Sequence, residues 1–224
     1  MRALYFPDLN SKIKSYNIEK RSSSFHHLSN VLRIRTNDQL LLLNGSGDSV
    51  LAQVIVSKCI TLNLLGEVIK NKRNKLIHLY IGLTKPDSFK RVIQNSTECG
   101  VASINPVISE FSQRYKINYE KLHKISISSL EQSNNYHLPV LNEAINISNL
   151  KEDSNHSYIL DCAVEKKPSI VNNGETNIFI GPEGGWSVKD IDIIENKYET
   201  SYLKLNLPIL RSYNAVVASI GYLN

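Results

Sequence analysis

Gly181-Pro182-Glu183-Gly184-Gly185-Trp186-Ser187 follows an apolar strand expected over residues 177–180 and precedes a helix. Ser187 and Asp190 have the spacing of a capping box, which predicts that the helix begins at Ser187. A strand that enters a helix through a glycine-rich loop is typical of open parallel α/β sheets, in which ligands bind beyond the carboxyl ends of the strands. We therefore expect a ligand site at this loop. The alternative is a tight turn that needs glycine only for its backbone conformation.

The chemistry of this loop restricts the ligand. The segment is neither Gly-x-Gly-x-x-Gly nor a nucleotide loop ending in Gly-Lys-Ser/Thr. Glu183 adds a negative charge that would repel a phosphate. A neutral or cationic ligand is therefore the better fit.

The chain on both sides of this loop alternates between strand and helix patterns, which predicts a parallel α/β sheet covered on both faces. Strands are expected over 77–83, 103–108, 158–163, 177–180 and 202–205. Helices are expected around the following apolar sets: Phe89, Val92, Ile93 and Ser96, ending near Gly100; Tyr119, Leu122, Ile125 and Leu130; Ile191 and Ile194; Val216, Ile220 and Leu223.

The first seventy residues have a different pattern. A short helix around Phe25, capped by Ser23 or Ser24, precedes apolar runs over 39–44, 49–56 and 60–69, with hairpin-turn residues at 45–48. Three strands with short connections predict a small antiparallel barrel or sheet. The polar run 71–75 is the expected linker, so we predict two domains, 1–70 and 76–224.

A second loop, Leu205-Asn206-Leu207-Pro208-Ile209-Leu210-Arg211-Ser212, also joins a strand end to a helix and is unusually apolar. Three interpretations remain open, because exposed apolar residues need something to pack against. The loop can line a pocket for a flat apolar group such as adenine, pack at a subunit interface, or form part of the core.

Composition excludes several classes of protein. The 224 residues have a net charge of +5, which is compatible with a polyanionic partner or simply with a well-solvated surface. Three cysteines without a Cys-x-x-Cys pair argue against disulfides and structural zinc, and favour the reducing cytoplasm. We also expect no other metal site, no Gly-x-Ser-x-Gly hydrolase, no membrane-spanning helix and no signal peptide.

Five motifs, in order along the chain, resemble the RsmE family of bacterial 16S ribosomal RNA uridine N3-methyltransferases in the SPOUT superfamily. The motifs are His26-His27-Leu28-Ser29-Asn30-Val31-Leu32-Arg33; Glu98-Cys99-Gly100-Val101 through Pro106 to Ser109-Glu110-Phe111-Ser112; Glu131-Gln132-Ser133 with Leu138-Pro139; the Gly181–Ser187 loop; and Ile209-Leu210-Arg211 with Ala215. They span about 190 residues.

The resemblance implies an N-terminal PUA-like barrel and a C-terminal SPOUT α/β domain with a trefoil knot. It further implies a cytoplasmic homodimer that methylates N3 of one uridine in 16S ribosomal RNA on the small ribosomal subunit, with S-adenosylmethionine as methyl donor and no metal.

The resemblance also implies site residues. Donor-binding residues would be Leu160, Asp161, Gly181, Pro182, Glu183, Gly184, Gly185, Leu205, Leu207, Ile209 and Leu210. Glu183 would face the sulfonium, and Arg211 would polarise a uridine carbonyl, with Tyr213 as a further catalytic candidate. RNA phosphates would be bound by Arg33, Arg35, Lys72, Arg73 and Arg114.

One departure from the family pattern affects the expected activity. Ser212-Tyr213-Asn214 stands where the family has Thr-Glu-Thr. Either Tyr213 replaces the glutamate, or the protein is an RNA-binding relative that has lost catalysis. A third alternative is a SPOUT methyltransferase that acts on another RNA position.

Overall fold

The computed structural model describes residues 2–31, 33–161 and 174–224. The chain divides into two compact units. The first contains Met1–Lys72 and Leu130–His137, and the second contains Arg73–Ser129 and Leu138–Asn224. No pattern in the sequence predicted that Leu130–His137 belongs with the first unit.

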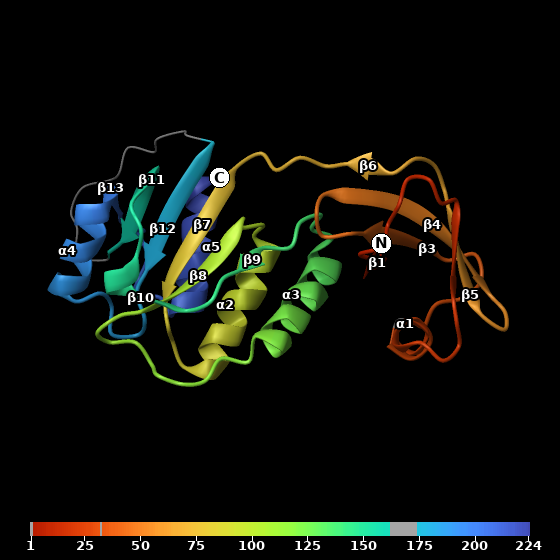
Figure 1. The fold of residues 1–224 in the computed structure, drawn as a ribbon, viewed down its shortest axis with the longest axis horizontal. Coiled ribbons are helices and arrows are strands. Elements are labelled where there is room, and N and C mark those ends of the chain that lie inside the picture. The colour runs from red at the N-terminus through yellow and green to blue at the C-terminus, as the bar shows by residue number, and fades with distance from the viewer. Residues whose placement is uncertain (1, 32, 162–173) are drawn as a thin grey trace. The chain divides into compact units, whose positions relative to one another are not determined.

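The first unit is built on a mainly antiparallel sheet with the strand order β1-β3-β4-β5-β2, and β6 pairs with β4 (Figure 1). Only β1 and β3 are parallel neighbours. The strands are β1 (Arg2–Tyr5), β2 (Ser15–Ile18), β3 (Gln39–Leu43), β4 (Asp48–Val56), β5 (Ile60–Leu64) and β6 (Ile69–Lys70).

Two details of this unit differ from expectation. The single strand predicted over 60–69 is wrong, because β5 ends at Leu64 and the chain passes through Gly66, whose φ is 118°. The short helix α1 (Ser23–His26), continued by the π-helical turn η1 (His27–Val31), is capped by Ser22 rather than Ser23 or Ser24. The Ser22 hydroxyl accepts a hydrogen bond from the Phe25 amide at 3.1 Å.

Specific hydrogen bonds join Leu130–His137 to the first unit. The Tyr5 amide donates to Oε1 of Glu131 at 2.8 Å, and the Gly47 amide donates to the carbonyl of Tyr136 at 3.0 Å. The chain therefore enters the second unit at Arg73 and returns to the first unit at Leu130.

The second unit contains a parallel sheet with the strand order β10-β8-β7-β12-β11-β13, and β9 pairs with β8 (Figure 1). This confirms the predicted mixed α/β architecture. Its strands are β7 (Leu76–Gly82), β8 (Ser103–Ile108), β9 (Val140–Leu141), β10 (Ile145–Asn146), β11 (Asp153–Leu160), β12 (Glu175–Ile180) and β13 (Tyr198–Leu203). Its helices are α2 (Pro86–Glu98), α3 (Tyr119–Ser133, whose last turn lies in the first unit), η2 (Ile147–Asn149), α4 (Val188–Lys197) and α5 (Ser212–Leu223).

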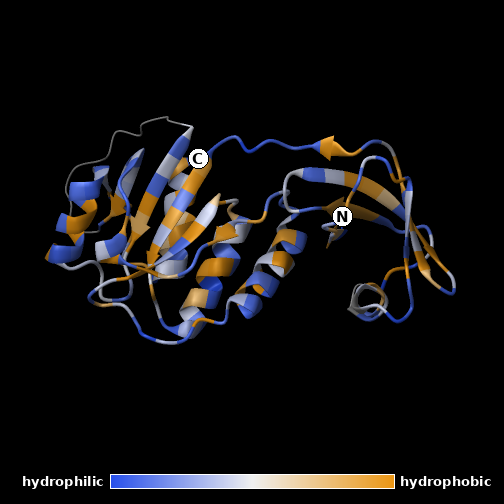
Figure 2. Ribbon diagram, viewed as in Figure 1, coloured by the Kyte–Doolittle hydropathy of each residue, from blue (hydrophilic) through white to orange (hydrophobic). Residues whose placement is uncertain are grey.

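Alternate residues of the strands enter two separate apolar clusters, because successive side chains in a strand point to opposite faces. On β12, Ile178 and Ile180 pack with residues of α2 and α5, whereas Phe179 packs with Ile194 of α4. Both faces of the sheet are therefore covered by helices. Figure 2 shows the resulting apolar strands and helix faces in orange.

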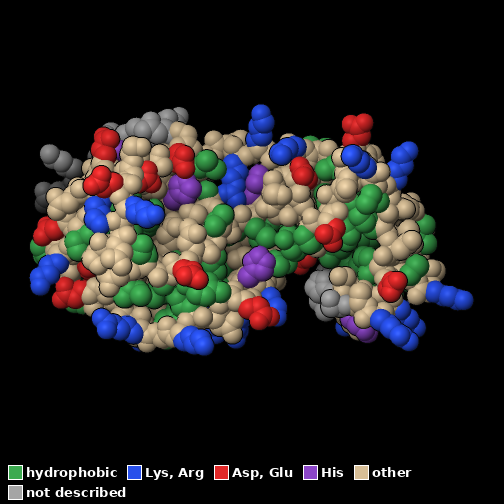
Figure 3. Space-filling model, in the orientation of Figure 1, with side chains coloured by type: hydrophobic (Ala, Val, Ile, Leu, Met, Phe, Trp, Pro, Cys, Tyr) green, Lys and Arg blue, Asp and Glu red, His purple; other side chains and the backbone are tan. Residues whose placement is uncertain are grey.

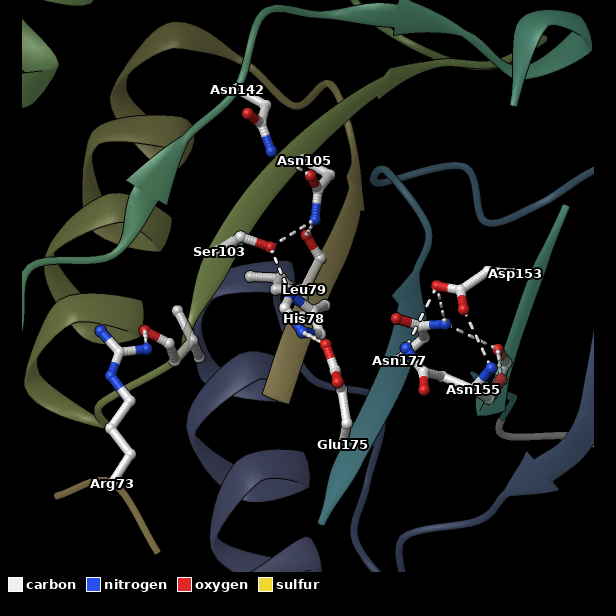
Figure 4. Close-up of polar contacts among 12 residues, drawn as sticks. Arg73, His78, Leu79, Ser103, Asn105, Asn142, Asp153, Asn155, Glu175 and Asn177 are labelled. Carbon is white, nitrogen blue, oxygen red and sulfur yellow. Dashed lines mark hydrogen bonds and ion pairs between the residues drawn. The ribbon is translucent and has the colours of Figure 1, made fainter. Parts of the chain in front are cut away.

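The amino-terminal halves of the strands carry a polar network (Figure 4). Nδ1 of His78 on β7 lies 2.8 Å from the Ser103 hydroxyl, and its Nε2 lies 2.8 Å from the Glu175 carboxylate. Asn105 donates to Ser103 at 2.9 Å and accepts from Asn142 at 2.6 Å. These bonds tie neighbouring strands together at the end of the sheet opposite the carboxyl-terminal loops.

Two predicted strands are shifted. β11 begins earlier than expected and ends at Leu160, and the predicted residues 162–163 lie outside the described residues. β13 begins directly after α4 and ends at Leu203, so Leu205 lies beyond the strand. No helix within the described ranges is long and apolar enough to cross a membrane.

The close approach of Gly82 and Pro182 yields the first prediction. A Cβ atom on Gly82 would lie 2.3 Å from Cδ of Pro182. Gly82→Ala should therefore lower the free energy of unfolding by about 1–3 kcal/mol through overpacking. Gly221→Ala in the interior of α5 is the control, because nothing lies within 4 Å of its added Cβ and alanine favours the helix by about 0.8–1 kcal/mol.

Urea unfolding of the three proteins measures both effects. Equal stability of Gly82→Ala and the unsubstituted protein would show that the loop yields to a methyl group.

Candidate functional site

A cavity of about 540 Å³ lies at the carboxyl ends of β11 and β12, beside the loop that leads into α5. All three of its walls belong to the second unit. Its lining residues are Ile159, Leu160, Asp161, Ile180, Gly181, Pro182, Glu183, Gly184, Gly185, Trp186, Ile191, Ile209, Leu210, Arg211, Ser212 and Ala215. The structure thus brings together the two loops that the sequence analysis selected, which are separated by about twenty residues in the chain.

The glycine loop folds back closely on itself. A Cβ atom on Gly181 would lie 2.9 Å from the backbone carbon atoms of Gly185. The Gly185 amide donates to the Pro182 carbonyl at 2.9 Å, and Gly185 has a φ of 73°, which favours glycine. The loop therefore presents backbone rather than side chains to much of the cavity.

The capping box predicted at the start of α4 is confirmed. The Ser187 hydroxyl accepts from the Asp190 amide at 3.2 Å, and the Asp190 carboxylate accepts from the Ser187 amide at 3.0 Å. The same buried carboxylate also lies 3.4 Å from the Glu110 amide. Asp190 thus anchors the end of the glycine loop to the segment that follows β8.

Glu183 connects the glycine loop to α2. Its Oε1 atom accepts a hydrogen bond from the Lys85 amide at 3.2 Å. Lys85 is the N-cap of α2 and makes no side-chain cap of its own, so the carboxylate satisfies a free amide at the positive end of the helix dipole. Burial, with a smaller contribution from the charge of Glu183, raises the pKa of the Tyr115 phenol to about 12.

Two residues that line this cavity, Trp186 and Ser212, carry buried polar atoms. Nε1 of Trp186 and Oγ of Ser212 are buried, and within the described ranges neither atom has a hydrogen-bond partner. A buried donor without a partner costs about 1–3 kcal/mol, so a bound ligand that accepts these hydrogens would be favoured.

Arg211 lines the cavity from the N-cap position of α5. Its Nη1 atom lies 3.2 Å from the hydroxyl oxygen of Tyr213, and Nη1 of Arg91 lies 3.4 Å from the same oxygen. The hydrogen bond from Arg211 holds the pKa of the Tyr213 phenol below its usual range, and the charges of Arg211 and Arg91 act in the same direction.

Most of the predicted donor-binding residues lie together in the cavity wall, but three of the predicted site residues do not. Leu205 and Leu207 are absent from the lining, because the chain after β13 turns outward and returns only at Ile209; Leu207 is 53% exposed. Tyr213 is buried beside α2, behind Arg211. Six further lining residues were not among the predicted site residues: Ile159, Ile180, Trp186, Ile191, Ser212 and Ala215. Trp186 and Ala215 lie within motifs quoted above, and Ser212 ends the second loop.

The residues predicted to bind RNA separate into two groups. Arg33, Arg35, Lys72 and Arg114 are exposed. Arg73 instead donates to the carbonyls of Val101 and Leu138, both at 3.0 Å (Figure 4), and burial lowers its pKa. Unlike the exposed cations, Arg73 therefore uses its guanidinium for hydrogen bonds within the second unit.

Charge alone does not outline a binding surface. On the face shown in Figure 3, Lys and Arg side chains are interspersed with Asp and Glu side chains on both units. Within the part of the chain that the structure describes, no group of three or more His, Cys, Asp or Glu side chains could hold a metal ion.

Comparison with known proteins identifies the family. The RNA methyltransferase domain family matches residues 71–224, and the RNA methyltransferase PUA domain family matches residues 22–60. Ribosomal RNA small subunit methyltransferase E from Aquifex aeolicus is 31% identical over 169 residues, which are 70% of this chain and 73% of that protein. This chain belongs to the RsmE family of RNA methyltransferases. The resemblance seen in the five motifs is thereby confirmed.

Other RsmE proteins match a larger share of the chain. The protein of that name from Rickettsia conorii is 28% identical over 205 residues, which are 88% of this chain and 84% of that protein. The crystal structure of the Neisseria gonorrhoeae RsmE bound to S-adenosylmethionine superposes with a TM-score of 0.84 at 24% identity, covering 100% of this chain and 96% of that one. A methyltransferase from Legionella pneumophila in complex with S-adenosylmethionine gives 0.76 at 26% identity, covering 99% and 96%.

The two hydrogen bonds that Arg73 donates to backbone carbonyls yield a second prediction. Arg73→Ala should lower the free energy of unfolding by about 1.5–3 kcal/mol, because two carbonyls lose a charged donor. It should leave the salt dependence of RNA binding unchanged. Lys72→Ala, the matched neighbour, should change stability by less than about 0.5 kcal/mol and reduce the salt slope if Lys72 contacts a phosphate.

Urea unfolding and filter binding at several salt concentrations test both variants. A reduced salt slope in Arg73→Ala would instead show that Arg73 contacts an RNA phosphate.

Proposed function

We propose that this protein transfers a methyl group from S-adenosylmethionine to N3 of one uridine in 16S ribosomal RNA of the small ribosomal subunit. The observation that carries the proposal is the single cavity formed by the ends of β11 and β12 and the loop before α5, in a chain of the RsmE family. Relatives that bear the RsmE name, and two solved structures with S-adenosylmethionine bound, support the reaction class and the donor.

The cavity has the chemistry that this donor requires. S-adenosylmethionine supplies a methyl group already activated on a sulfonium. Glu183 and Asp161 place two negative charges in the wall against the one positive charge of Arg211, and the rest of the wall is largely apolar side chains and glycine backbone, so the site favours a cationic ligand over a phosphate. The hydrogens of Trp186 and Ser212 are suited to acceptor atoms of an adenine or a carboxylate.

The target uridine would be activated by Arg211. Methylation at N3 requires the imide to lose its proton, which places negative charge on the flanking carbonyl oxygens. A guanidinium at the cavity wall can donate hydrogen bonds to such an oxygen and stabilise the anion. Ile159, Ile180, Ile191 and Leu210 surround the site with apolar surface that excludes water and strengthens this interaction.

We assign RNA capture to exposed cations of both units. Arg33, Arg35 and Lys72 lie in the first unit, which contains the match to the PUA family, and Arg114 lies in the second. Each phosphate neutralised by one of these side chains would steepen the salt dependence of binding. Action on a ribosomal subunit places the protein in the cytoplasm.

We further propose a homodimer in which the loop before α5 contacts a second copy. Ile209 is 88% exposed, and Leu207 and Val217 are also exposed, so this part of the second unit presents apolar surface that a partner would cover. The dimer would place the donor site near the interface, since Ile209 also lines the cavity.

The trefoil knot of the SPOUT fold also belongs to this proposal. Support comes from the family match of the second unit alone.

The third prediction tests the reaction. Purified protein, incubated with small subunits that lack the modification and with methyl-labelled S-adenosylmethionine, should produce labelled 3-methyluridine on nucleoside analysis. Label on a ribose or on another base would contradict the N3 assignment. Tight subunit binding without transfer would instead favour an RNA-binding relative that has lost catalysis.

The fourth prediction concerns donor binding. Ser212→Ala removes a hydrogen that the bound donor would accept, so its affinity should fall about 3–10-fold, equivalent to about 0.5–1.5 kcal/mol. Ser219→Ala is the matched control, because Ser219 is also buried on α5 without a described partner but does not line the cavity. Calorimetry with S-adenosylmethionine gives both affinities, and an equal change in the two variants would remove Ser212 from the site.

A further inference from the structure

Two guanidinium groups, one from α2 and one from the N-cap of α5, converge on a single hydroxyl oxygen. The hydroxyl oxygen of Tyr213 lies 3.2 Å from Nη1 of Arg211 and 3.4 Å from Nη1 of Arg91. The guanidinium carbon of Arg91 also lies 5.1 Å from the centre of the Tyr213 ring, within the range of a cation–π interaction. The guanidinium groups of Arg211 and Arg91 therefore share the hydroxyl oxygen of Tyr213 as a partner.

Tyr213 is itself held firmly by α2. It is 9% exposed, and its backbone carbonyl accepts a hydrogen bond from Nδ2 of Asn95 at 2.7 Å. Asn95 and Arg91 are one turn apart on α2, so one face of this helix contacts both the backbone and the side chain of Tyr213. The phenol oxygen is thereby placed at a defined point behind the cavity wall.

We propose that Tyr213 is a positioning residue that holds the Arg211 guanidinium at the cavity, and that Arg91 holds Tyr213 in turn. This inference rests on the proposed function, in which Arg211 faces the uridine. It replaces a direct catalytic role for Tyr213, which does not line the cavity.

Physical chemistry supports this arrangement. A free arginine side chain samples many rotamers, and fixing it costs about 2 kcal/mol of entropy that substrate binding would otherwise have to supply. A hydrogen bond from Arg211 to the hydroxyl of a side chain that is itself packed against α2 would meet part of this cost before the RNA arrives. The hydrogen bond from Arg211, together with the charges of Arg211 and Arg91, lowers the pKa of the Tyr213 phenol, as expected for two cations that lie beside its oxygen.

The fifth prediction uses two variants that remove this contact with little change in volume. Tyr213→Phe deletes the shared oxygen and keeps the ring, while Arg91→Gln deletes the supporting cation. Each should lower kcat for methyl transfer by about tenfold or more, because the reacting group loses its orientation, and each should leave the Kd for S-adenosylmethionine within about twofold. In an Arg211→Ala background, Tyr213→Phe should have no further effect, because it acts through Arg211.

Matched controls exist on the same helices. Tyr222→Phe removes an exposed hydroxyl from α5, and Lys90→Gln removes the cation next to Arg91 on α2; both should retain full kcat. Single-turnover transfer to small subunits and calorimetry with S-adenosylmethionine provide the two readouts, and urea unfolding confirms that the variants are folded.

The possible failures can be told apart. Multiplicative losses of kcat for Tyr213→Phe and Arg211→Ala would overturn the positioning role while leaving Arg211 in the mechanism. An unchanged kcat in Tyr213→Phe would do the same. An unchanged kcat in Arg211→Ala would overturn both this inference and the role of Arg211 in the proposed function.

Discussion

The close backbone contact between Gly181 and Gly185 at the carboxyl end of β12 is the constraint on which the site depends. A side chain at Gly181 would overlap the returning loop, and Pro182 already fills the space beside Gly82 on the neighbouring strand β7. Glycine at positions 181 and 185 allows the chain to make this turn and still leave the adjoining cavity open. The cavity wall is thus a consequence of packing at the carboxyl-terminal end of the sheet, before any ligand is considered.

Helix α2 connects the two loops of the site. The Lys85 amide at its N-terminus binds Glu183 of the glycine loop, and Asn95 and Arg91 further along contact Tyr213 beside the second loop. Helix α2 therefore sets the distance between Glu183, which we propose favours a cationic donor, and Tyr213, which we propose orients Arg211. Substitutions on α2 can alter the chemistry even though α2 contributes no residue to the cavity lining.

Several features of the site were predictable from sequence because they depend on local chemistry. The capping box of Ser187 and Asp190, the strand before Gly181 and the helix that buries Phe89 and Val92 all arise from residues a few positions apart. The surroundings of Leu207 and Arg73 were not predictable, for the opposite reason. Leu207 is exposed because of the path of a whole loop, and Arg73 bonds to carbonyls 28 and 65 residues away.

The sequence by itself determined the α/β class, the order of the helices and strands, the RsmE resemblance and the two loops that carry the chemistry, because periodicity, capping residues and glycine positions are local signals. Only the tertiary structure decided that these loops enclose one cavity, that Leu130–His137 packs with the first unit, and that Tyr213 lies behind Arg211 rather than in the wall. Such facts depend on contacts between residues that are distant in the sequence, such as Arg91 and Tyr213, and no local pattern encodes them.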